Sequence, residues 1–120
     1  MKAVVVSDLH VEINDGGKIR ESIWPEADVL ISAGDLCPAV YLGDKRTDID
    51  SRSCKKALEY MKENVFPKYR YVIDVDGNHS HYKFNYEDTK NAMMSYFSDV
   101  PNYIHLENQD FMLDDVLFIG

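Results

Sequence analysis

The segment KAVVVSDLH, residues 2–10, decides the fold. Its small and β-branched residues run without alternation from Ala3 to Val6, which predicts a strand buried on both faces of a sheet. Asp8 and His10 follow two positions apart, so an extended backbone would point both side chains to the same side. A carboxylate and an imidazole placed in this way are suitable ligands for a divalent metal ion.

Two further apolar runs end in the same way. Residues 29–31 lead into Asp35, and residues 71–73 lead into Asn78 and His79. Open α/β sheets build their sites where strands deliver polar residues at their carboxyl ends. The chain is therefore predicted to be an α/β protein with a mixed, largely parallel sheet, flanking helices and a site at one edge of the sheet.

Length and composition indicate a single domain, residues 1–120, with an ordinary hydrophobic core. The apolar run at 3–6 is far too short for a membrane span or the core of a signal peptide, so we expect a cytoplasmic protein without a membrane partner. Cys37 and Cys54 fall in unlike contexts, a loop and a helix face, and are expected to be free thiols.

The charge balance is acidic. The chain has 21 acidic and 13 basic residues, a formal charge of −8, which disfavours electrostatic binding to nucleic acid or to an anionic membrane. An anionic substrate remains compatible with this charge, because bound divalent cations would set the local field at a site.

A helix is predicted to begin near Asp50 or Ser51, either of which is a common N-cap residue, and to end before Pro67. Because it joins two predicted strands, those strands are expected to pair in parallel. Its apolar residues form one stripe typical of a helix that covers a core: Cys54, Ala57, Leu58, Met61 and Val65.

The rest of the chain is expected to hold a loop and shorter elements. Residues 11–24 show no clean period and indicate a loop, whereas residues 87–97 indicate a second helix. Short strands are predicted over 103–107, 111–113 and 116–119, the last of them buried.

Three short motifs occur in order, each after a predicted strand: D-x-H at residues 8–10, G-D at 34–35 and G-N-H at 77–79. Together they resemble the N-terminal half of the calcineurin-like metallophosphoesterase superfamily. The resemblance covers essentially the whole chain, including the closing segment FMLDDVLFIG, residues 111–120. It implies the N-terminal half of a four-layer sandwich and a metal-dependent phosphoesterase.

The resemblance also implies a role for each motif residue. Asp8 and His10 would hold the first metal ion, Asp35 would bridge two ions, and Asn78 would hold the second. His79 would be catalytic, facing the phosphate while a hydroxide activated by the two metals attacks phosphorus. The implied cofactors are two divalent ions, Mn, Fe, Zn or Mg.

The chain departs from the family pattern at two places. Ser80 stands where the family usually has an acidic residue, and the family's C-terminal histidine and G-H-x-H motifs are absent; His105 is expected to be structural. The domain would then be a shortened form whose metal sites are only partly occupied. The missing ligands would come from a missing C-terminal half or from another copy in a homo-oligomer.

Two functions remain open from the sequence. The first is hydrolysis of phosphomonoesters or phosphodiesters, with nucleic acid entering only as a substrate. The second is a catalytically incomplete metal-binding or protein-interaction module that retains the fold. The intact motif residues favour the first function, whereas Ser80 and the absent C-terminal ligands favour the second.

Overall fold

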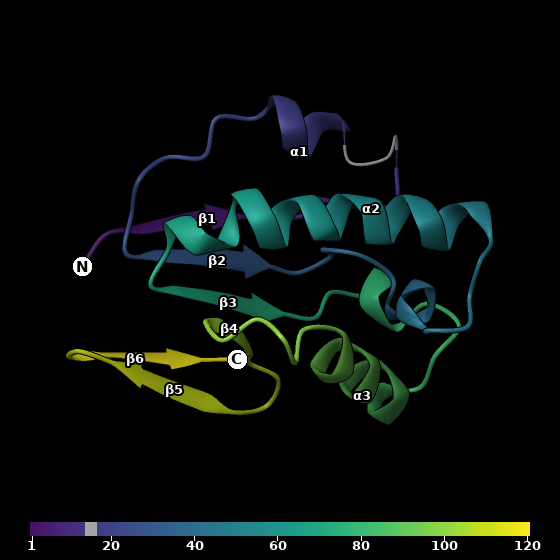
Figure 1. The fold of residues 1–120 in the computed structure, drawn as a ribbon. Helices are drawn as coiled ribbons and strands as arrows, with labels where there is room; N and C mark the ends of the chain where they lie inside the picture. Colours follow the sequence, from purple (N-terminus) through teal and green to yellow (C-terminus); the bar gives the residue numbers. More distant parts are fainter. Residues whose placement is uncertain (14–16) are drawn as a thin grey trace.

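Residues 1–13 and 17–120 are described by a computed structural model, in which a four-stranded parallel sheet of order β1-β2-β3-β4 accompanies a separate antiparallel pair (Figure 1). The predicted α/β architecture with a largely parallel sheet is confirmed. The strands are β1 Ala3–Val6, β2 Val29–Ala33, β3 Tyr71–Val75, β4 Tyr103–His105, β5 Asp110–Leu113 and β6 Val116–Ile119.

Within residues 1–13 and 17–120, three α-helices and three 3-10 turns connect these strands. They are α1 Gly17–Glu21, η2 Ala39–Leu42, α2 Ile49–Asn64, η3 Phe66–Lys68, η4 His79–His81 and α3 Tyr86–Tyr96. The prediction of a loop over 11–24 is wrong for residues 17–21, which form helix α1. This helix buries Ile19 in the core, and the Trp24 indole N–H donates to the Ile19 carbonyl at 3.1 Å. Residues 14–16 of that prediction lie outside the described residues.

Helix α2 covers the core as predicted, but it begins earlier. Asp48, rather than Asp50 or Ser51, is the N-cap, and its carboxylate accepts from the Ser51 amide at 3.2 Å. The whole predicted apolar stripe is at most 1% exposed: Cys54, Ala57, Leu58, Met61 and Val65. The two strands that α2 joins, β2 and β3, pair in parallel.

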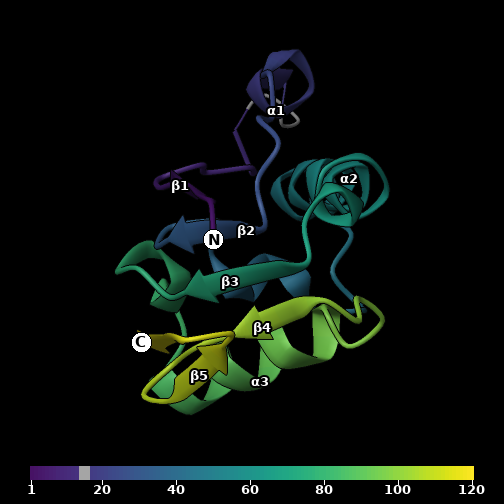
Figure 2. The same cartoon turned by 90° about the vertical axis from the view of Figure 1, so that its left-hand side faces the viewer.

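The two faces of the sheet are covered differently. Leu30 and Val72 pack under the helices, whereas Val29 and Ile73 pack with the region that carries the hairpin β5–β6. Figure 2 shows α2 and the hairpin on opposite sides of the sheet. The hairpin follows β4 in the chain, and β4 lies at the opposite end of the sheet from β1. The face of β1 on the hairpin side is therefore left uncovered, and Val5 is 63% exposed.

Two burial predictions are therefore wrong. The first strand is not buried on both faces, because the hairpin β5–β6 packs beside the other strands and leaves one face of β1 uncovered. The last strand is not buried either, since Ile119 is 79% exposed on β6. A run of apolar residues does not distinguish a central strand from an edge strand, because both have the same local pattern.

The register of the sheet brings three loops to one edge. Ser32 of β2 lies beside both Val6 of β1 and Asp74 of β3, and Asp74 lies beside His105 of β4. The residues that follow these strands consequently gather at the carboxyl edge of the sheet. Across 1–13 and 17–120, no helix is long and apolar enough to cross a membrane.

Candidate metal centre

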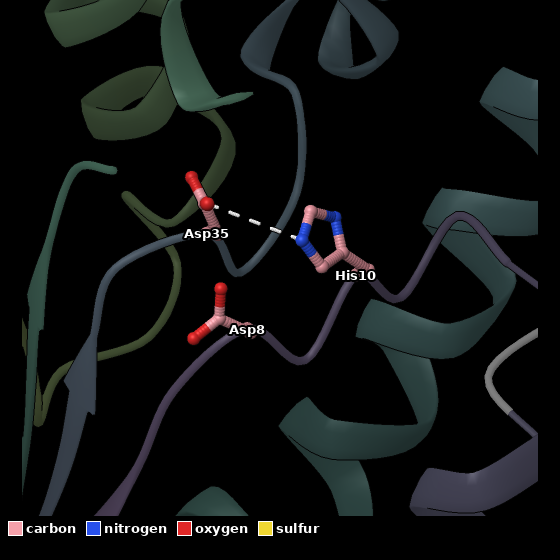
Figure 3. A group of neighbouring side chains, drawn as sticks. All are labelled: Asp8, His10 and Asp35. Carbon is pink, nitrogen blue, oxygen red and sulfur yellow. Dashed lines mark ion pairs between the residues drawn. The ribbon is translucent and has the colours of Figure 1, made fainter. Parts of the chain in front are cut away.

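Asp8, His10 and Asp35 meet at this carboxyl edge. One ligand-capable atom from each residue lies within 4.8 Å of the corresponding atoms of the other two. The Nε2 atom of His10 is 3.9 Å from Oδ2 of Asp35, and Figure 3 shows the three side chains brought together from two neighbouring loops. The parallel sheet thus assembles two carboxylates and an imidazole from positions 27 residues apart, Asp8 to Asp35.

The backbone at this place is unusual. The loops after β1 and β2 stay paired beyond the strands, with the Asp8 amide donating to the Gly34 carbonyl at 3.0 Å and the His10 amide to the Asp35 carbonyl at 3.1 Å. Asp8, His10 and Asp35 have φ values of +53°, +43° and +56°, in the left-handed region that residues other than glycine rarely adopt. The extended geometry predicted for Asp8 and His10 is therefore wrong, because left-handed turns bring their side chains together. Such strain concentrates at functional sites.

Asp35, in the loop after β2, lies between the loop after β1 and the loop after β3. Its Oδ1 atom accepts from the His79 amide at 2.9 Å, and its side chain is largely buried. A Cβ atom added at Gly77 would lie only 2.6 Å from the Asp35 Cγ atom, so position 77 requires glycine. One carboxylate thus contacts residues of both loops, as a ligand shared between two metal ions would have to.

Glu12 is a site residue that the sequence did not reveal. Its Oε1 atom is 3.1 Å from Nδ1 of His10, and its backbone carbonyl accepts from the Ser53 hydroxyl of α2 at 3.1 Å. A carboxylate at Nδ1 favours the tautomer that carries the proton there, which leaves the Nε2 lone pair directed toward Asp35. Glu12 was not recognisable in advance, because its contact depends on the left-handed turn at His10.

The loop after β3 places the remaining predicted residues around the same group. The rings of His79 and His10 are 4.9 Å apart between centroids in an edge-to-face arrangement, and the side chains of His79 and Asn78 are exposed. Ser80 is buried, and its hydroxyl accepts from the Gly77 amide at 3.0 Å. Ser80 therefore shapes the turn, and no contact joins its hydroxyl to the His79 ring within the described part of the chain.

The donor set fits a divalent cation. Two carboxylates and one neutral imidazole nitrogen suit the hard or borderline ions Mn, Fe, Zn and Mg, and cysteine is absent from this described group. The burial of Asp35 would strengthen its attraction to a cation, because the surroundings screen charge less than water does. Metal binding by Asp8, His10, Asp35 and Asn78, and catalysis by His79, stay predictions.

Comparisons with known proteins find one sequence relative and one solved structure of similar fold. No protein-family model matches the chain. An uncharacterized protein of Acanthamoeba polyphaga mimivirus is 29% identical over 123 aligned residues, which cover 96% of this chain and 41% of that protein. The crystal structure of phosphopantetheinyl hydrolase from Mycobacterium tuberculosis superposes with a TM-score of 0.58 at 19% identity, over 93% of this chain and 37% of that one.

The chain thus spans about two fifths of the length of the relatives it matches. At 19% identity the structural likeness establishes a shared fold, in agreement with the predicted architecture. The neighbour is a hydrolase that shares its fold with this α/β domain.

Proposed function

We propose that this chain carries the metal-binding part of a phosphoesterase site, in which Asp8, His10 and Asp35 hold one divalent ion and Asp35 and Asn78 hold a second. The observation that carries the proposal is the convergence of the first three side chains within 4.8 Å at the carboxyl edge of the sheet. The contact of Glu12 with His10 supports it, because ligating histidines usually donate their second ring N–H to a carboxylate or carbonyl.

Two bound divalent ions would lower the pKa of a water molecule and neutralise the charge that develops on a phosphoryl group. The chain's own residues would position these ions and manage the proton. Asp35 is held by the His79 amide, and His10 by Glu12, so both ligands are fixed before a substrate arrives. His79, whose ring is exposed beside that of His10, would deliver a proton to the leaving oxygen.

A phosphomonoester or phosphodiester is the substrate class that this chemistry favours. The phosphopantetheinyl hydrolase with the same fold acts on a phosphate-containing group, which supports a phosphoester here. Divalent ions at the site would offset the formal charge of −8 and attract an anionic substrate.

A second function, a metal-binding module without turnover, is favoured by one specific observation. Among the described residues, the second ion would have only Asp35 and Asn78 as ligands, because the family's C-terminal histidine and G-H-x-H motifs are absent from the sequence. The acidic residue that would orient His79 is replaced by Ser80, whose hydroxyl accepts from the Gly77 amide at 3.0 Å. Two protein ligands hold a divalent ion loosely. Under this alternative the first ion binds and no ester is hydrolysed.

The two functions separate in one assay. We would measure hydrolysis of bis-p-nitrophenyl phosphate and p-nitrophenyl phosphate by the full chain with Mn²⁺, beside Asp35→Asn and the control Glu63→Gln, an exposed carboxylate on α2. The proposal predicts turnover by the parent and by Glu63→Gln that Asp35→Asn abolishes. Absence of turnover together with Mn²⁺ binding that Asp35→Asn weakens would favour the module.

A further inference from the structure

A second group of ligand-capable side chains shares no residue with the first. Asp76, His105 and Glu107 each present an atom within 4.8 Å of the other two. They lie at the other end of the same sheet edge, around the carboxyl ends of β3 and β4. The proposed phosphoesterase site makes no use of them.

The parallel pairing of β3 and β4 fixes these residues side by side. Asp74 lies opposite His105 in the register, and the Leu106 amide continues the ladder by donating to the Asp74 carbonyl at 2.8 Å. Beyond the strands, the Asp76 amide donates to Oε2 of Glu107 at 3.1 Å. The backbone pairing of β3 and β4 therefore places Asp76 and His105, and the Asp76 amide holds the side chain of Glu107 beside them.

Two of the side chains are buried without adequate partners. The side chains of Asp76 and His105 are only 1% and 3% exposed, and Asp76 Oδ1 lies 3.1 Å from His105 Nε2 as an ion pair that lacks hydrogen-bond geometry. Among the described residues, neither carboxylate oxygen of Asp76 and neither ring nitrogen of His105 has a hydrogen-bond partner. Leaving such groups unpaired away from water is costly, and a bound cation would satisfy them together.

The surrounding charge also favours a cation. The buried carboxyl group of Asp74 adjoins the group, so three acidic side chains, those of Asp74, Asp76 and Glu107, surround one imidazole. Two of these carboxylates are oriented by tyrosine hydroxyls. Tyr103 donates to Asp74 at 2.6 Å, and Tyr86 donates to Glu107 at 2.5 Å. A single proton on His105 would leave an excess of negative charge that a divalent ion can balance.

From this geometry we propose that Asp76, His105 and Glu107 bind a divalent cation of the Zn²⁺ or Co²⁺ class at a site separate from Asp8, His10 and Asp35. One imidazole nitrogen and two carboxylates form a donor set that such ions accept. The Tyr86 hydroxyl and the Asp76 amide already orient Glu107, as the outer partners of ligating carboxylates do. The ion ties β4 to the start of the loop that carries Asn78, and so supports that loop.

Cobalt titration of a chain that lacks the first site tests this proposal. In the full chain with Asp8→Asn and His10→Asn, we expect one Co²⁺ per chain, seen as visible absorption bands of a nitrogen-ligated ion. Adding His105→Gln should weaken this binding about tenfold or more. Adding Glu63→Gln, at an exposed carboxylate on α2 outside both groups, should leave it unchanged. Absence of bound Co²⁺, or binding that survives His105→Gln, would overturn the proposal.

A second measurement avoids any substitution at the buried histidine. In ¹⁵N spectra of the parent chain, addition of Zn²⁺ should shift one ring nitrogen of His105 to a metal-bound position. A ring that shows two protonated nitrogens with and without Zn²⁺ would mean that a proton is the only cation there, and would refute the site. Neither experiment depends on turnover, so failure of the phosphoesterase proposal would leave both results intact.

Discussion

Glu12 shows how the candidate site depends on a single contact. The carboxylate lies 3.1 Å from Nδ1 of His10, so it determines which ring nitrogen is free to bind a metal ion. The motif residues Asp8, His10 and Asp35 could be chosen from the sequence, because each follows an apolar strand. Glu12 could not, because nothing in a strand pattern predicts the left-handed turn at His10 that brings the two side chains together.

Glu12→Gln should weaken binding of the first metal ion. Glutamine retains a carbonyl oxygen for Nδ1–H but loses the charge, so we expect a loss of affinity of about tenfold. Calorimetric titration with Mn²⁺ would measure it, with Glu63→Gln as the matched control on α2. Equal affinity in the parent and in Glu12→Gln would show that Glu12 does not act on the ligand.

Asp74 should make the stability of the protein depend on pH. Burial raises the pKa of its carboxyl group to about 6, although the Tyr103 hydroxyl hydrogen bond opposes this. Because the folded state favours the protonated form, the stabilising effect is complete below the ordinary pKa near 3.8 and is lost as the pH rises through about 6. The shift of about two units corresponds to about 3 kcal/mol.

Asp74→Asn removes this titration. The free energy of unfolding of Asp74→Asn, relative to the parent, should therefore increase between pH 4 and pH 7 by as much as about 3 kcal/mol. Urea unfolding of both proteins across this range, without added metal, provides the measurement. A difference that stays constant with pH would contradict the assigned burial effect.

The order of elements follows directly from the sequence, and their exposure does not. The apolar stripe of α2 and the parallel pairing of the strands it joins were both predictable, because local periodicity and connection length determine them. The exposed face of β1 depends on where the distant hairpin β5–β6 packs, which local patterns do not encode. The helix start at Asp48 was missed because several neighbouring residues are equally good caps.

A substitution at Gly77 would test how tightly the loops after β2 and β3 pack against each other. A methyl group at Gly77 would collide with Asp35, so Gly77→Ala should destabilise the fold and weaken metal binding. Gly17→Ala is the matched control, since an added Cβ there meets nothing within 4 Å and alanine favours helix α1. Thermal unfolding and Mn²⁺ titration should show losses for Gly77→Ala alone. Equal behaviour of the two variants would mean that the loops separate easily.

On the scale of the whole molecule, one face of the sheet stays open beside β1. Val5 is 63% exposed there, and no strand of the described residues pairs with the outer edge of β1. Exposed apolar surface and a free strand edge both favour association. The chain also spans about two fifths of the length of the relatives it matches.

We therefore expect the chain to self-associate through this face at high concentration. Val5→Lys should shift sedimentation toward the monomer, because a charged side chain on the edge strand opposes pairing. Ile23→Lys serves as control, since Ile23 is 91% exposed and lies between α1 and β2, outside the strands of the sheet. A parent chain that remains monomeric at high concentration would contradict the expectation.

The central claim is that Asp8, His10 and Asp35 form a metal site at the carboxyl edge of the sheet. Anomalous diffraction from crystals grown with Mn²⁺ tests it most directly. The account predicts an anomalous peak within bonding distance of all three side chains, absent in Asp35→Asn. Crystals without a peak there, or with a peak that contacts none of these residues, would contradict the claim.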